Sequence, residues 1–91
     1  MSNIPYGRQD INQADIDAVV AVLHSDFLTQ GPAVQAFENS VANYCKAKHA
    51  VAVNSATSAL HIACLALGVG KGNIVWTTPI TFVASANCVL Y

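Results

Sequence analysis

Charged residues are scarce in this sequence. Four of its 91 residues are Lys or Arg and five are Asp or Glu, which is 10% charged residues, where soluble domains average roughly 25%. The net charge of −1 excludes the basic patch that nucleic-acid binding requires. A small domain needs a polar surface, but 54% of the residues are hydrophobic. We therefore expect the chain to be the N-terminal part of a larger protein that covers its apolar residues.

Long apolar runs, a secretory leader and paired cysteines are also missing. The longest apolar runs without glycine, residues 18–23 and 62–67, are far shorter than the ~18 residues of a membrane span. Residues 1–10 lack the basic and apolar regions of a signal peptide, so we expect a cytoplasmic protein. The three cysteines, Cys45, Cys64 and Cys88, form no C-x-x-C pair; we expect free buried thiols and no metal site.

Two helices are predicted in the first half of the chain. Asn12 is suited to cap the first, with Asp15 three residues later and Ile11 and Ile16 at the positions of a hydrophobic staple. Pro32 suits the first turn of the second helix. The apolar face of that second helix consists of Val34, Phe37, Val41 and Tyr44.

In the second half, short β-branched stretches alternate with helical ones. Residues 50–53 and 74–77 predict two buried strands, residues 57–67 a buried helix, and residues 81–91 a further helix. The order helix, helix, strand, helix, strand, helix is typical of an α/β protein with a mainly parallel sheet and flanking helices. Ligands bind at the carboxyl ends of such strands, so residues 54–58 and 77–81 are expected to face one pocket.

The loop at residues 54–58, Asn-Ser-Ala-Thr-Ser, has two interpretations. Ser55 would simply cap the helix that follows. Alternatively, the unpaired N–H groups of the first turn, with the hydroxyls of Thr57 and Ser58, would bind a phosphate. In the second loop Phe82 is either a core residue or a platform for a flat cofactor ring. Trp76 is expected in the core or at an interface, and His61 as a buried histidine.

Together, the two loops and their surroundings resemble the DegT/DnrJ/EryC1/StrS family of sugar aminotransferases, which are fold-type-I pyridoxal 5'-phosphate enzymes. The shared motifs are T-Q-G-P at residues 29–32, F-E at 37–38, S-x-T-x-A-L at 55–60, A-L-G-V-G-x-G at 66–72 and T-P-x-T-F-x-A-x-A-N at 78–87. The usual G-D of the turn is Gly72–Asn73 here, and both Asp and Asn suit turns.

The resemblance implies roles for individual residues. Thr57 and Ser58 would hold the cofactor phosphate, and Phe82 would stack on the pyridine ring. Residues 1–31 would form an N-terminal arm, a first helix and a substrate-side loop, and residues 32–91 the start of the large cofactor-binding domain. The implied substrate-side residues, near the interface of a homodimer, are Tyr6, Thr29, Gln30 and Gly31.

The resemblance also implies a reaction. The resemblance is strongest to the branch that aminates C4 of UDP-linked 4-keto-6-deoxy-N-acetylhexosamines, as in pseudaminic acid synthesis. The implied amino donor is glutamate. The lysine that carries the cofactor in this family lies beyond residue 91, so we expect the isolated chain to be inactive and poorly folded. Two alternatives stay open: a sugar dehydratase of the same family, with histidine in place of that lysine, and a truncated non-catalytic protein.

Overall fold

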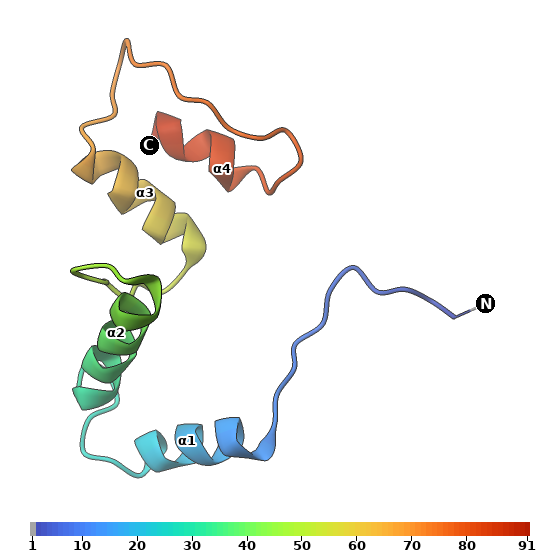
Figure 1. The fold of residues 1–91 in the computed structure, drawn as a ribbon, viewed down its shortest axis with the longest axis vertical. Coiled ribbons are helices and arrows are strands. Elements are labelled where there is room, and N and C mark those ends of the chain that lie inside the picture. Colours follow the sequence, from blue (N-terminus) through green and yellow to red (C-terminus); the bar gives the residue numbers. More distant parts are fainter. Residues whose placement is uncertain (1) are drawn as a thin grey trace. The chain divides into compact units, whose positions relative to one another are not determined.

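The structure is a computed structural model that describes residues 2–91. Its elements in chain order are α1 (Gln13–Leu23), α2 (Pro32–Cys45), α3 (Ala56–Ala66), the short α4 (Ala84–Asn87) and the 3-10 helix η1 (Cys88–Leu90) (Figure 1). The chain divides into two units, Met1–Ala47 and Lys48–Tyr91, and each is described by itself. Among the described residues, no helix combines the length and apolar character needed to cross a bilayer.

The predicted capping box at the start of α1 is confirmed. The Asp15 N–H donates to Asn12 Oδ1 at 3.1 Å, and the Asn12 N–H donates to Asp15 Oδ2 at 3.0 Å. The helix ends at Leu23 with His24 as its C-cap. Side-chain oxygens therefore accept hydrogen bonds from two of the four N–H groups that a helix start leaves unpaired. These two bonds stabilise the exposed helix locally.

The predicted start of α2 at Pro32 is also confirmed. Gly31 is the N-cap and makes no side-chain capping bond. A β-carbon at Gly31 would lie 2.5 Å from the Phe27 Cβ, so the loop from Phe27 into α2 closes too tightly for a side chain there. At the other end Lys46 adopts a left-handed conformation (φ 55°), and its N–H and that of Ala47 return to carbonyls of the last turn.

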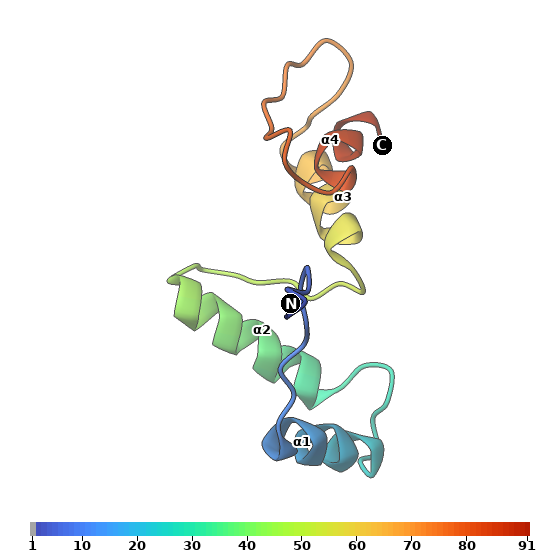
Figure 2. The same ribbon diagram turned by 90° about the vertical axis from the view of Figure 1, so that its right-hand side faces the viewer.

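In the second unit, α3 begins one residue before its predicted start and ends at Ala66. The turn that follows it is closed by Asn73, whose Oδ1 accepts from the Gly70 N–H at 2.7 Å. A carboxylate can accept the same bond, so Asn and Asp are equally suited to this position. The further helix predicted over residues 81–91 is present only as α4 and η1, which both contact α3 (Figure 2).

The prediction of an α/β fold with a mainly parallel sheet is wrong for this structure. Residues 2–91 contain no strand, and the two predicted strands, 50–53 and 74–77, are irregular. Ile74 and Trp76 are 87% and 92% exposed, so Trp76 is not a core residue. The physical reason is that a strand is stable only beside other strands. Two four-residue stretches do not make a sheet, and the β-branched pattern alone supplies no partner.

Apolar burial is slight in both units. Among residues 2–91 the buried residues are Ala42, Ala84 and Cys88, and the predicted buried helix α3 contains no buried residue. The exposed area is 8,496 Å². A folded monomer of 9.5 kDa exposes about 5,000 Å², and two separate folded units of half that mass about 6,100 Å² together. The excess of roughly 2,400 Å² therefore reflects missing cores within the units themselves.

We expect the isolated 91-residue chain to unfold without a cooperative transition. Its helices are stabilised mainly by local hydrogen bonds, and these break one by one rather than together. Heating should reduce the helical circular dichroism signal gradually, and the exposed apolar side chains should bind the dye ANS before heating. A sharp sigmoidal melt with no dye binding would show that the isolated chain buries a core.

Candidate functional site

The first turn of α3 carries a network of three hydroxyl and amide side chains. Ser55 is the N-cap, and its Oγ accepts from the Ser58 N–H at 3.1 Å. The Ser55 hydroxyl donates to Ser58 Oγ at 3.0 Å, and the Ser58 hydroxyl donates to Asn54 Oδ1 at 2.9 Å. The capping interpretation of Ser55 is therefore confirmed. The N–H and the hydroxyl of Ser58 therefore both donate hydrogen bonds within this network.

Thr57 differs from its neighbour Ser58 in its free donors. It occupies the second position of α3, is half-buried, and has no hydrogen bond from its N–H or its hydroxyl within the described chain. The Ala56 N–H is likewise without an acceptor, whereas the Ala59 N–H already donates to the Ser55 carbonyl. Because no acidic residue lies in this turn, the helix dipole is uncompensated there. The turn thus offers an anion two N–H groups and one hydroxyl.

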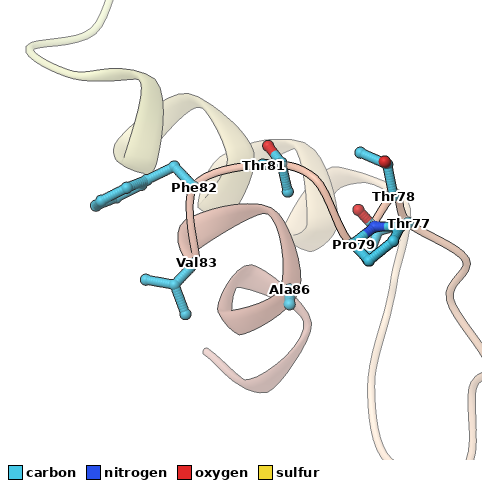
Figure 3. Close-up of a pocket in the computed structure, with 7 residues that line it drawn as sticks. All are labelled: Thr77, Thr78, Pro79, Thr81, Phe82, Val83 and Ala86. Atoms are coloured by element: carbon cyan, nitrogen blue, oxygen red, sulfur yellow. The ribbon is translucent and has the colours of Figure 1, made fainter. Parts of the chain in front are cut away.

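A second candidate feature is an open hollow of about 450 Å³ beside the start of α4. Its lining comes from the loop at residues 77–82 and from α4. Figure 3 shows Phe82 at one end of the lining, Thr77 and Thr78 at the other, and Thr81 between them. The lining residues are Thr77, Thr78, Pro79, Thr81, Phe82, Val83 and Ala86.

Phe82 presents its ring to solvent. The side chain is 74% exposed, so it is not a core residue in this structure. Its backbone is tied into the next helix, because the Phe82 carbonyl accepts from the Ser85 N–H at 3.1 Å. The Thr81 and Ser85 hydroxyls are 3.1 Å apart and hydrogen-bonded. The ring is thus mounted on an ordered turn with a free face for an aromatic ligand.

The predicted substrate-side residues lie in the first unit. Tyr6 is fully exposed in the extended segment before α1. Thr29 and Gln30 are exposed in the loop between α1 and α2, and Gly31 is the half-buried N-cap of α2. They do not line either of two hollows that lie along the apolar face of α1.

Sequence reasoning missed two sets of residues. Asn54 was considered only as a loop residue, but it holds the Ser58 hydroxyl. The threonines at 77, 78 and 81 line the hollow with Phe82. The Thr-Thr-Pro-x-Thr pattern was visible, but hydroxyl side chains are common in turns for local reasons. Conversely, His61 is half-buried against the Tyr91 ring rather than in a core.

The structure does not join the two features into one cavity. Thr57 and Ser58 lie outside the lining of the hollow beside Phe82, although α3 and α4 are in contact. In residues 2–91 no three His, Cys, Asp or Glu side chains converge to hold a metal ion.

Comparison with known proteins gives consistent results. The chain is 51% identical over 87 residues to a UDP-4-amino-4,6-dideoxy-N-acetyl-beta-L-altrosamine transaminase of Campylobacter jejuni (strain 81-176), covering 96% of this chain and 23% of that protein. It is 44% identical over 88 residues to the spore coat polysaccharide biosynthesis protein SpsC of Bacillus subtilis, covering 97% and 23%. It is 40% identical over 91 residues to a UDP-4-amino-4-deoxy-L-arabinose–oxoglutarate aminotransferase of Shewanella sediminis, covering 98% and 24%.

The chain therefore spans about a quarter of the length of these relatives. No solved structure matches it significantly. The sequence profile of the DegT/DnrJ/EryC1/StrS aminotransferase family matches residues 9–91, which is nearly the whole chain. This chain belongs to the DegT/DnrJ/EryC1/StrS aminotransferase family.

Proposed function

We propose that the protein carrying this chain is a pyridoxal 5'-phosphate-dependent nucleotide-sugar aminotransferase. It transfers an amino group from glutamate to C4 of a UDP-linked 4-keto-6-deoxy-N-acetylhexosamine. The observation that carries the proposal is the family match over residues 9–91, together with 51% identity to a transaminase of a UDP-linked 4-amino sugar. A place in pseudaminic acid synthesis and a cytoplasmic location belong to the same proposal.

The residues at the start of α3 fit the phosphate of this cofactor. Thr57 would donate its hydroxyl and its N–H, and the Ala56 N–H would add a third donor. Ser58 would contribute less to phosphate binding, because its hydroxyl already donates a hydrogen bond to Asn54 Oδ1. For Ser58 to donate to the phosphate, that bond to Asn54 must break. Thr57 is therefore the stronger anchor of the two proposed residues.

The exposed Phe82 ring fits the flat pyridine ring. The cofactor, when bound, supplies the electron sink for amino transfer. Phe82 would orient the ring and shield one face from water, while Thr57 would hold the far end at the phosphate.

On the substrate side, Tyr6, Thr29, Gln30 and Gly31 would contact the nucleotide sugar. This assigns residues 1–31 to a substrate-side arm and residues 32–91 to the start of the cofactor-binding domain. We also propose a homodimer. The exposed apolar faces of α1 and α2 support covering by further protein, since a soluble monomer rarely leaves such faces in water.

We expect Thr57→Val to weaken binding of pyridoxal 5'-phosphate to the full-length protein by about 5- to 150-fold. This corresponds to ~1–3 kcal/mol for the loss of a hydrogen bond to a charged group. Thr57→Ser keeps the hydroxyl and should restore most of the affinity. The dissociation constant is measured by titrating the apoprotein with cofactor and following its absorbance.

Ser58→Ala is the matched control for this experiment. Because the Ser58 hydroxyl is engaged with Asn54, its removal should cost less affinity than Thr57→Val. Equal affinity of wild type and Thr57→Val would remove Thr57 from the phosphate site. A larger loss for Ser58→Ala would transfer the anchoring role to Ser58.

Phe82→Ala should shift the absorbance band of the bound cofactor and weaken its binding by about 2- to 12-fold. The range follows from the ~0.5–1.5 kcal/mol that an aromatic pair contributes beyond buried area. Phe82→Tyr retains the ring and should keep both the spectrum and the affinity. An Ala variant with an unchanged spectrum would place the cofactor ring elsewhere.

The reaction itself is tested with ¹⁵N-glutamate and a UDP-linked 4-keto-6-deoxy-N-acetylhexosamine. The full-length protein should place ¹⁵N at C4 of the sugar and release 2-oxoglutarate in equal amount. Mass spectrometry and nitrogen-coupled NMR detect both products. A sugar product that has lost water and gained no nitrogen would identify a dehydratase instead.

A further inference from the structure

Two of the three cysteines meet where η1 contacts α3. Cys64 lies on α3 and is half-buried, and Cys88 begins η1 and is only 5% exposed. The Cys64 and Cys88 side chains are close enough to interact electrostatically. Within a chain that buries very few side chains, this thiol pair lies at one of its best-covered places.

A neighbouring ring contact defines the register of the two segments. The rings of His61 and Tyr91 meet edge to face, with centroids 5.2 Å apart and planes inclined at 69°. His61 precedes Cys64 by three residues, and Tyr91 follows Cys88 by three. Residues three apart share one side of a helix, so His61 and Cys64 lie on the same side of α3, while Cys88 begins η1 and Tyr91 is its C-cap.

The environment of Cys64 favours its protonated thiol. Desolvation raises the pKa of Cys64, and the interaction with Cys88 raises it further. Cys88 also donates a weak hydrogen bond from Sγ to the Ser85 carbonyl at 3.5 Å. No third ligand converges on the pair within residues 2–91, so these thiols do not form a metal site there.

We propose that Cys64 and Cys88 are a redox-sensitive pair that a low-molecular-weight disulfide oxidises to an intrachain disulfide linking α3 to η1. The inference does not depend on the proposed function. The oxidant is of the glutathione disulfide class. The Cys64 thiolate, being the more exposed, attacks one sulfur of the oxidant and releases one glutathione thiol.

The Cys88 thiolate then attacks the Cys64 sulfur of the mixed disulfide and releases the second glutathione thiol. The two protein thiols lose two protons and two electrons, and the oxidant gains both. The product fixes η1 against α3, the helix whose first turn carries Thr57.

Cys45 provides an internal comparison. It is exposed at the end of α2, in the other unit of the chain. It is also closer in sequence to Cys64 than Cys88 is. Because shorter loops close at a lower entropic cost, an unfolded chain pairs Cys45 with Cys64 at least as often as it pairs Cys64 with Cys88. Preferential pairing of Cys64 with Cys88 therefore requires the folded contact.

The test is oxidation of the 91-residue chain with glutathione disulfide, in buffer and in 8 M urea, followed by quenching with acid. Trypsin cuts after Arg8, Lys46, Lys48 and Lys71, so the three cysteines fall in different peptides, 9–46, 49–71 and 72–91. In buffer, the disulfide joining peptides 49–71 and 72–91 should exceed each other pairing by about fivefold or more. In urea that preference should disappear. The same distribution in buffer and in urea would overturn the proposal.

Two variants sharpen the result. Cys45→Ser should leave the Cys64–Cys88 disulfide unchanged, whereas Cys88→Ser should stop the reaction at the mixed disulfide of Cys64 with glutathione. The pKa of Cys64 is raised, so Cys64 remains mostly protonated between pH 7 and 8 and its thiolate fraction increases about tenfold over that range. The rate of Cys64–Cys88 disulfide formation in buffer should therefore also increase about tenfold. Cys64–Cys88 disulfide formation with no dependence on pH, or a Cys88→Ser chain that acquires no glutathione at Cys64, would contradict the mechanism.

Discussion

Hydrogen bonds at the helix ends are the interactions on which this structure depends. The Asn12–Asp15 capping box starts α1, the Ser55 side chain starts α3, and a left-handed Lys46 closes α2. Each uses atoms within a few residues in sequence, so none needs a tertiary partner. In most small domains apolar burial supplies most of the stability, but here very few side chains are buried. The helices are therefore formed locally, and their apolar faces remain available.

The same local chemistry shapes the candidate site. The Ser55 cap and the Asn54 amide take up the protons of Ser58, and this leaves Thr57 as the residue with free donors at the positive end of α3. Phe82 is held by the turn that leads into α4, with its ring outside any core. The two features sit on helices that contact each other. The turn that carries the Thr57 donors and the turn that carries the Phe82 ring are thus both held by backbone and hydroxyl hydrogen bonds.

Several predictions from the sequence were confirmed, and all of them concern local signals. The capping box at Asn12, the proline start of α2 and the serine cap of α3 each depend on residue types a few positions apart. The family resemblance was confirmed over residues 9–91, because ordered motifs along the chain do not need a tertiary fold to be recognised. The parallel sheet was not confirmed. The Asn54 bond to Ser58 and the threonine lining were missed, since turn residues of these types have ordinary local explanations.

The sequence by itself determined, to within one residue, where α1, α2 and α3 begin and which family the chain belongs to. It also determined which residue types stand at the two loops. Only the tertiary structure decided that Trp76 and Phe82 lie in solvent, that Ser58 is engaged while Thr57 is free, and that Cys64 meets Cys88. Caps and turns act over three or four residues, whereas burial, strand pairing and contacts between helices depend on segments far apart in the chain.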